Sequence, residues 1–345
     1  MSARLVFGGD IAILRDNPEN AFGEVTDTIR EADLAVANLE FALSDRGKPV
    51  RGKMLPHKGP ASAMAALVDA GFDALNLANN HVLDYGEEPL LDTLDGLAKS
   101  NIAAFGAGRN ADEAARPVMV ERNGLKIGLL GFTTTLPNGF AATENLPGVD
   151  PFRVVTSYRP LRNPEEYPGS PAIIETRANA HDLARLIARV KALKGDVDLV
   201  LVYAHWGASM TDAVLDFQRE IGHAAIDAGA AAVFGGHQHV ASAVEFYQGR
   251  PIAHGLGNLV FDFDAPFFTD ATQRALLFTS DLTKDGLENC RLICCRTGIN
   301  GPIDRLNPEV DGGSLLSNRL AHLSEPLGTS LLIGREDIEV CATAE

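Results

Sequence analysis

The sequence contains few cysteines and no long apolar segment. Among its 345 residues there are four cysteines, all in the last sixth of the chain and none in a C-x-x-C spacing: Cys290, Cys294, Cys295 and Cys341. This argues against a zinc knuckle, a redox pair or a disulfide-stapled domain, so we expect reduced thiols. No apolar run approaches the roughly 20 residues of a membrane-spanning helix, and the apolar stretch after Met1 is too short for a signal peptide. We therefore expect a cytoplasmic protein without membrane insertion.

Basic residues are outnumbered by acidic ones: 30 Lys and Arg stand against 46 Asp and Glu, and the formal net charge is −16. Such a surface repels phosphate backbones and anionic lipids, so nucleic acid is not an expected partner. It suits cations, or substrates that reach an anionic protein through a bound metal. The remaining composition, with 46% hydrophobic residues, 33 Gly and 18 Pro, is that of a globular protein of one large or two ordinary domains.

Short apolar runs alternate with amphipathic stretches over the first 240 residues, which is the pattern of β-α-β units and predicts an α/β fold. We expect strands at 5–7, 34–39, 73–77, 102–105, 117–121, 126–132, 199–203, 231–234, 241–247, 251–253 and 275–282. The expected helices are 21–31, 61–70, 87–99, 181–194 and 213–228. The strands at 117–121 and 126–132 are predicted to form a hairpin that turns at Asn123-Gly124.

Two segments depart from this alternation. Residues 133–180 are rich in proline and show little periodicity, which predicts an insertion or lid rather than a plain linker. From about Cys290 onward the pattern weakens. We expect one domain over 1–285, with 133–180 as its insertion, and an extension over 286–345 packed on the same domain.

Polar side chains that suit metal binding follow five of the predicted strands. They are Asp10, Glu40, Asn80 with His81, His205, and the pair His237 and His239. Because ligands bind at the carboxyl ends of strands in α/β sheets, these positions can converge on one site. A mixed set of oxygen and nitrogen ligands without thiolate suits one or two Mn²⁺, Zn²⁺ or Fe²⁺ ions, and Ca²⁺ is kept as a fourth candidate.

His81 is the candidate general acid or base, and Asp84 is the carboxylate that would orient its ring. Each candidate also has a structural alternative. Asp10 and Asp84 can cap helices, Glu40 can be a solvated loop acid, and asparagines can serve turn geometry. The paired histidines in the glycine-rich turn at 235–239 fit packing least well.

Several short motifs resemble the CapA family of bacterial capsule and poly-γ-glutamate synthesis proteins, which is related to calcineurin-like metallophosphoesterases. In order along residues 4–265 these motifs are Gly9-Asp10, Asn38-Leu39-Glu40, Asn79-Asn80-His81 with Asp84-Tyr85-Gly86, His205-Trp206-Gly207, Gly236-His237-Gln238-His239 and Gly257-Asn258-Leu259-Val260-Phe261-Asp262. The resemblance implies a calcineurin-like four-layer α/β/β/α sandwich with mixed sheets.

The resemblance also implies two metal positions. One would be held by Asp10, Glu40 and His239, but Ala12 stands where the superfamily has a further histidine. The other would take Glu40, Asn80, His205 and His237, and that set is complete. Asn258, Lys58 and Trp206 are candidate substrate contacts. Asn258 can equally be a turn residue. For Lys58 and Trp206 a structural role is the preferred alternative, because only local context supports a place in the pocket.

Three functions are compatible with these residues. The first is a metal-dependent hydrolase that cleaves a phosphoester or amide-like bond of a small molecule or peptide, with metal-activated water and His81 as general acid. The second is a peptide epimerase that uses the same site for acid/base chemistry at an α-carbon. The third is a non-enzymatic factor in poly-γ-glutamate or capsule synthesis or export. The oligomeric state stays open.

Overall fold

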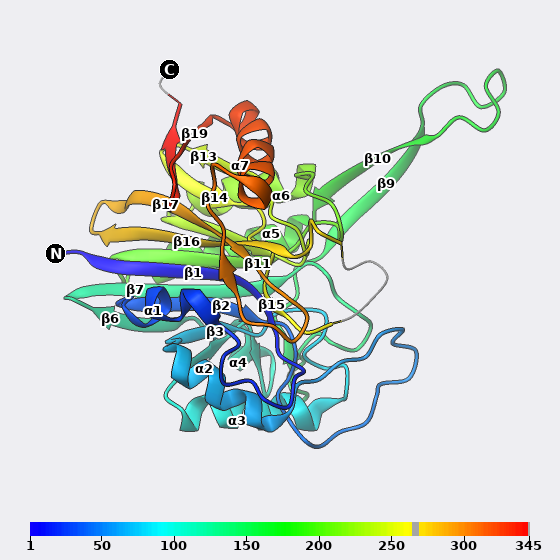
Figure 1. Cartoon of the computed structure of the whole chain (residues 1–345). Coiled ribbons are helices and arrows are strands. Elements are labelled where there is room, and N and C mark those ends of the chain that lie inside the picture. Colours follow the sequence, from blue (N-terminus) through cyan, green and yellow to red (C-terminus); the bar gives the residue numbers. More distant parts are fainter. Residues whose placement is uncertain (264–268, 344–345) are drawn as a thin grey trace.

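The computed structural model describes residues 1–263 and 269–343. Two mixed β-sheets pack face to face, and helices cover the outer face of each sheet (Figure 1). One apolar core lies between the sheets, and a further core lies between each sheet and its helices. This is a four-layer α/β/β/α sandwich, so the fold class expected from the sequence is confirmed.

Within the described residues, ten strands form the larger sheet. In order across the sheet they are β19 (Thr329–Ile333), β20 (Ile338–Ala342), β17 (Gly286–Arg296), β16 (Arg274–Thr283), β1 (Ala3–Ala12), β2 (Leu34–Leu39), β3 (Ala74–Asn76) and β4 (Ala103–Phe105), with β15 (Asn258–Phe261) beside β1 and β18 (Asp304–Arg305) beside β17. Strands β1 to β4 and β15 run parallel, whereas β16 and β17 are antiparallel. The carboxyl ends of β1, β2 and β3 therefore share one edge.

The described residues place six strands in the smaller sheet. Their order is β13 (Val244–Tyr247), β14 (Arg250–Ala253), β12 (Ala232–Gly236), β11 (Leu199–His205), β7 (Leu125–Thr133) and β6 (Val118–Arg122). β7, β11, β12 and β14 are parallel. The ring of Phe7 stacks on that of Phe234, with centroids 4.0 Å apart. This contact ties β1 to β12 across the two sheets, so the carboxyl ends of both sheets meet.

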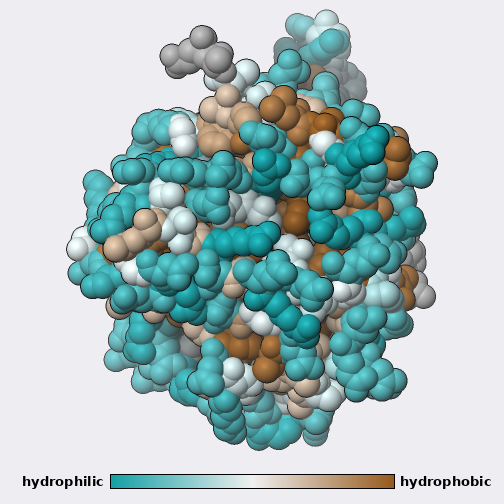
Figure 2. Space-filling model, turned by 60° about the vertical axis from the view of Figure 1, so that its left-hand side comes forward, coloured by the Kyte–Doolittle hydropathy of each residue, from teal (hydrophilic) through white to brown (hydrophobic). Residues whose placement is uncertain are grey.

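The helices fall into three groups. Those that cover the larger sheet are α1 (Thr26–Arg30), α2 (Met64–Ala70) and α3 (Glu87–Lys99), preceded by the short 3-10 turns η1 (Gly23–Val25) and η2 (Ala61–Ala63). The smaller sheet is covered by α5 (Ala180–Lys194) and α6 (Asp216–Asp227). The remaining elements are α4 (Ala111–Ala115), α7 (Asp311–Ser324) and η3 (Glu325–Leu327). Every helix in the described part of the chain is too short or too polar to cross a bilayer. Hydrophilic residues cover most of the face shown in Figure 2.

Several local expectations differ from the structure in instructive ways. The helix expected at 21–31 is reduced to α1, because Gly23 has φ +44° and interrupts the helical path. The helix expected from residue 213 begins at Asp216, because the Gln238 amide donates to the carbonyls of Thr211 and Ala213. The hairpin turn is confirmed, since Asn123 and Gly124 both have the positive φ of a type I′ turn.

The low-periodicity description of 133–180 is wrong for its second half. After the short β8 (Gly148–Val149), which pairs with β5 (Ala107–Gly108), the chain forms a long antiparallel hairpin of β9 (Val154–Pro160) and β10 (Ala172–Ala178). This hairpin, which we call the arm, projects away from the body of the molecule (Figure 1). The weak pattern after 290 likewise hides β17, which is paired along its length with β16.

Candidate metal centre

Three acidic and imidazole side chains meet where the carboxyl ends of the two sheets come together. Asp10 is in β1, Glu40 directly follows β2, and His205 ends β11. One ligand atom from each of the three lies within 4.8 Å of the others, and all three side chains are fully buried. Nε2 of His205 is 3.6 Å from the Glu40 carboxylate, and its Nδ1 is 3.9 Å from the Asp10 carboxylate. The chain thus gathers the donor types of a divalent cation site.

Two asparagines extend this cluster. The Asn80 carbonyl oxygen Oδ1 lies 2.9 Å from Nε2 of His205. Asn38, in β2, donates from Nδ2 to Asp10 at 2.8 Å and to Glu40 at 2.7 Å. Because one amide bridges both carboxylates, Asn38 fixes their separation. Asn38 in turn accepts from Asn76 at 2.8 Å, so a buried amide network lies beneath the acids.

The glycine-rich turn after β12 brings two more histidines to the same edge. His237 and His239 have φ values of +86° and +59°, which non-glycine residues rarely adopt. The backbone N–H of His237 donates to Asp10 at 3.0 Å, and the His237 ring centroid is 4.9 Å from that of His205. A Cβ at Gly236 would overlap the Asp10 carboxylate, so only glycine permits this close approach.

His239 is held differently. Its Nδ1 is 3.0 Å from Oδ1 of Asn258, whose amide also donates to the His239 and Thr272 carbonyls at 3.3 and 3.0 Å. Asn258 therefore anchors the turn. His237 and His239 stand outside the group whose ligand atoms lie within 4.8 Å, since that group contains only Asp10, Glu40 and His205 among the described residues.

The charges of this centre are not balanced by basic side chains. In the described part of the chain, no lysine or arginine forms an ion pair with Asp10 or Glu40. Burial raises the pKa of Asp10, opposed by its electrostatic interaction with His239 and by hydrogen bonds from the His237 N–H, Asn38 and Tyr203. Burial and the neighbouring Asp10 raise the pKa of Glu40 well above its usual range. Burial, together with the nearby histidines, holds the pKa of His205 well below its usual range.

Within residues 1–263 and 269–343, three buried polar atoms at the centre have no hydrogen-bond partner: Oε1 of Glu40, Nδ1 of His205 and Nδ1 of His237. A buried polar atom without a partner is costly, and several in one place are unusual for a site that serves packing. A divalent cation would accept these lone pairs and offset both carboxylates. The residues present therefore fit a bound metal, and Asp10, Glu40, Asn80, His205 and His237 are the side chains that could hold it.

A second group of side chains borders the centre on the Asn80 side. Nδ1 of His81 is 2.6 Å from Oδ2 of Asp84, which is fully buried and also accepts from the backbone N–H of His57 at 3.0 Å. Nζ of Lys53 is 2.8 Å from the other Asp84 oxygen and donates to the Asn80 carbonyl. Burial lowers the pKa of His81, although the Asp84 hydrogen bond opposes this shift. Asp84 thus orients the His81 ring and is itself held by Lys53.

Aromatic rings surround these imidazoles. The Phe41 ring lies edge-on to His81, with centroids 5.3 Å apart, and Phe261 packs in the same way against His239 at 5.0 Å. Phe263 packs against His57 at 4.2 Å. Apolar rings beside these imidazoles reduce the local dielectric constant and so strengthen electrostatic interactions there.

Two of the candidate substrate contacts are used elsewhere. Trp206 is fully buried and donates its indole N–H to the His254 carbonyl at 2.9 Å, and its ring packs in the core between the smaller sheet and its helices. Lys58 donates from Nζ to the Ser44 and Arg46 carbonyls, both at 2.7 Å. These contacts give both side chains structural partners.

Three residues that contact the side chains of the centre were not predicted from the polar positions that follow the strands. Asn38 bridges the acids, Tyr203 donates its hydroxyl to Asp10 at 3.1 Å, and Lys53 holds Asp84. Asn38 and Tyr203 interrupt otherwise apolar buried strands, and that interruption is a signal that sequence could have supplied. Lys53 lies in a loop and has no comparable signal.

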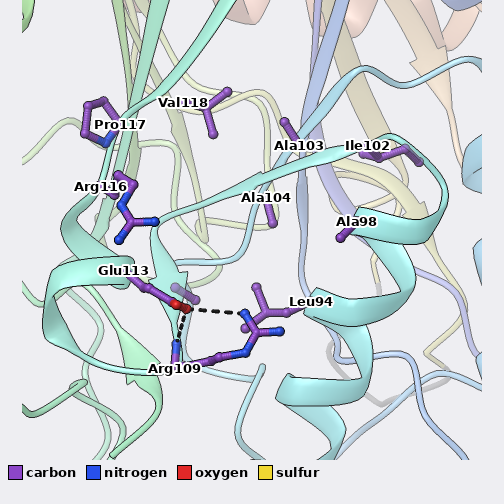
Figure 3. A pocket seen from close by; sticks show the side chains of 11 residues that line it. Leu94, Ala98, Ile102, Ala103, Ala104, Arg109, Glu113, Arg116, Pro117 and Val118 are labelled. Carbon is purple, nitrogen blue, oxygen red and sulfur yellow. Dashed lines mark hydrogen bonds and ion pairs between the residues drawn. The ribbon is translucent and has the colours of Figure 1, made fainter. Parts of the chain in front are cut away.

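One hollow lies apart from this centre: a cavity of about 350 Å³ between α3, β4 and α4. Its walls include the apolar side chains of Leu94 and Val118 (Figure 3). At its mouth Arg109 pairs with Glu113. None of the candidate metal ligands lines it.

Comparison with known proteins identifies the family of the chain. A family model described as bacterial capsule synthesis protein PGA_cap matches residues 4–263. The chain belongs to this family. The match spans every candidate ligand, and it confirms the resemblance to CapA proteins that the motifs carry.

Three relatives have related names. The PGA biosynthesis protein CapA of Bacillus subtilis is 32% identical over 246 residues, covering 71% of this chain and 57% of that protein. The capsule biosynthesis protein CapA of Bacillus anthracis is 29% identical, with coverages of 72% and 55%. A probable polyglutamine synthesis accessory protein of Mycobacterium tuberculosis is 31% identical, with coverages of 67% and 56%. The chain thus spans little more than half the length of these relatives.

Solved structures resemble the fold at low identity. A hypothetical protein from Thermus thermophilus is 16% identical with a TM-score of 0.48, covering 84% of this chain and 98% of that one. A novel phosphatase from Mycoplasma pneumoniae is 14% identical with a TM-score of 0.48, with coverages of 85% and 93%. At these values the likeness carries no argument about activity.

Proposed function

We propose that this protein is a metal-dependent hydrolase of the CapA-like metallophosphatase type, acting on a phosphoester or amide-like bond. The observation that carries the proposal is the cluster of Asp10, Glu40 and His205. In the described part of the chain its two buried carboxylates have no lysine or arginine partner, and imidazole nitrogens beside them have no hydrogen-bond partner. A bound divalent cation would supply Lewis acidity and lower the pKa of a water molecule.

The chain's own residues divide the remaining work. Asn38 keeps the Asp10 and Glu40 carboxylates at a fixed separation, and the Tyr203 hydroxyl orients Asp10. Asn258 anchors the turn that presents His237 and His239. A ligand set held in this way needs little rearrangement when a cation or substrate binds.

His81 is the proposed general acid. Its Nδ1 is engaged by Asp84 at 2.6 Å, so Nε2 is the nitrogen that would carry a proton to the leaving group. Asp84 orients the ring, and Lys53 and the His57 N–H hold Asp84 in turn. Asp84 and Lys53 are therefore positioning residues, whereas His81 would contact the substrate.

The test measures bound metal by elemental analysis and turnover of a chromogenic phosphate ester in the same preparations. We expect His205→Ala to lose metal and turnover together. His81→Asn should keep its metal and lose turnover by about a hundredfold or more, as for removal of a general acid. His181→Ala is the matched control, because the His181 side chain is 84% exposed on α5. A metal-free wild type, or a His205→Ala variant with full turnover, would contradict the proposal.

The names of the relatives support a second candidate. They are named for PGA biosynthesis, capsule biosynthesis and polyglutamine synthesis. The second candidate is that the centre of this chain binds a poly-γ-glutamate segment through its metal without turning it over. Calorimetry with defined γ-linked glutamate oligomers tests this. Tight binding by wild type, weakened in His205→Ala and accompanied by no product, favours the binding role over hydrolysis.

Peptide epimerisation, the remaining alternative, has its own readout. Incubation in D₂O would place deuterium at a substrate α-carbon only if a proton is removed there and returned. Hydrolysis would instead release new termini or phosphate without such exchange. The two chemistries are therefore separated by one mass-spectrometric measurement on the same reaction.

A further inference from the structure

The arm is an isolated two-stranded sheet. Among the described residues, β9 and β10 pair only with each other, from Val154–Ala178 at the base to Pro160–Ala172 near the tip. The base is fixed to the body, since the Ala178 N–H donates to Glu220 on α6. The outer part projects away from the body (Figure 1). Two strands alone are marginally stable in water, so an arm of this kind gains from a further surface to pack against.

The two faces of the arm differ in chemistry. Successive side chains alternate between the faces, so one face carries four cross-strand pairs without any charged residue: Val154–Ala178, Thr156–Thr176, Tyr158–Ile174 and Pro160–Ala172. The opposite face carries Arg159, Glu175 and Arg177, with Arg159 and Glu175 paired at 2.6 Å. On the uncharged face Tyr158 is 70% and Ile174 is 61% exposed, and they lie directly opposite each other.

The charge of the arm, compared with that of the whole chain, indicates which partner covers its uncharged face. The whole chain carries −16, but residues 153–178 contain four arginines and three glutamates. Two acidic bodies of this chain repel each other over most of their surface. The arm is a segment through which two copies can meet without that repulsion, and its projection keeps the bodies apart.

We propose that the arm joins two copies of this chain, with the uncharged face of one arm packed on the same face of the other about a two-fold axis. A two-fold contact must be self-complementary, and a face of aromatic, aliphatic and threonine side chains without charge meets that condition. The tip offers a place for the partner's side chains, because Tyr158, Arg162 and Tyr167 line a hollow of about 320 Å³ there. The proposal does not depend on the metal centre.

Sedimentation equilibrium over a range of protein concentrations tests it. Wild type should form a dimer. Tyr158→Glu and Ile174→Glu should each weaken the dimer at least about tenfold, because they bury a charge in an apolar contact. Val155→Glu is the matched control: Val155 is 52% exposed on the same strand but on the opposite face, where Arg177 lies across from it. That variant should dimerise like wild type.

Cross-linking gives an independent readout. Thr156 lies on the uncharged face, so the Thr156→Cys variant should form a disulfide-linked dimer under mild oxidation. Ser157 lies on the opposite face, so the Ser157→Cys variant should not. Three of the native cysteines are buried and do not compete. A wild type that stays monomeric at every concentration, or equal weakening by the Tyr158 and Val155 variants, would overturn the proposal. Circular dichroism of each variant checks that the fold is retained.

Discussion

Two regions of this protein bury carboxylates and treat them in opposite ways. Asp150 is 1% exposed. One of its carboxylate oxygens forms an ion pair with Arg185 at 2.6 Å, and the other forms an ion pair with Arg189. Asp10 and Glu40 are equally buried and receive no such partner within the described residues. This contrast between a buried acid paired with two arginines and two adjacent unpaired acids supports the proposal that an external cation binds at the second region.

Removing the charge of Asp150 should cause the largest loss of stability among these variants. Asp150→Asn leaves Arg185 and Arg189 partly buried without their counter-charge, so we expect the free energy of unfolding to fall by about 3 kcal/mol. Urea denaturation, repeated with chelator and with Mn²⁺, measures it. The loss should be the same in both conditions, because Asp150 is not a ligand. A loss below about 1 kcal/mol would mean that the arginine pairs are not stabilising as drawn.

Glu245 is a second buried acid with basic partners, and its contribution to stability should depend on pH. Burial of Glu245 is outweighed by hydrogen bonds from His254 at 2.9 Å and His223 at 2.6 Å, so its pKa is lowered from 4.5 to about 2. As the pH falls, Glu245 is therefore protonated in the unfolded chain at a higher pH than in the folded protein. Stability that is present above pH 4.5 should be lost between there and about 2, by up to about 3 kcal/mol. Glu245→Gln should flatten this acid limb of the stability curve measured with chelator present.

The unpaired region should respond to neutralisation in the opposite direction. Glu40→Gln removes a buried charge beside Asp10 and keeps an oxygen for the Asn38 amide. We expect the chelator-stripped variant to be more stable than stripped wild type by about 1 kcal/mol. Thermal unfolding of the two stripped proteins measures the difference. A clear loss of stability would show that Glu40 is satisfied without a cation.

The smallest effect concerns the residue that orients Asp10. Tyr203→Phe removes only the hydroxyl that donates to Asp10 at 3.1 Å. We expect about 1 kcal/mol of lost stability and a roughly tenfold weaker metal affinity. Tyr247→Phe is the control, because its hydroxyl reaches only Asp227 at the surface, at 3.3 Å. Competition with a fluorescent chelator compares both variants with wild type.

The convergence of the site could be read from sequence because it depends on topology. Parallel neighbouring strands place their carboxyl ends at one edge, and β1, β2 and β3 are such neighbours. That Asp10 and Glu40 would meet therefore followed from the strand pattern. The strand pattern did not predict how His205 reaches these acids from a separate sheet. The packing of one sheet on the other depends on the core around Phe7 and Phe234.

Other features needed three-dimensional contacts. The arm could not be predicted, because its prolines Pro164, Pro168 and Pro171 in the tip obscured the alternation on either side. Strand β17 was missed because its alternation is irregular and its cysteines carry the apolar positions. Lys53 comes from a loop, and nothing local distinguishes it from other surface lysines.

The proposed cation site of Asp10, Glu40 and His205 can be measured by calorimetric titration of Mn²⁺ or Zn²⁺ into chelator-stripped wild type and Glu40→Gln. We expect saturable binding to wild type and a thermal stabilisation that grows with metal concentration. The affinity of Glu40→Gln should be at least about a hundredfold weaker. No saturable binding to wild type, or equal affinity in the variant, would contradict the proposed site.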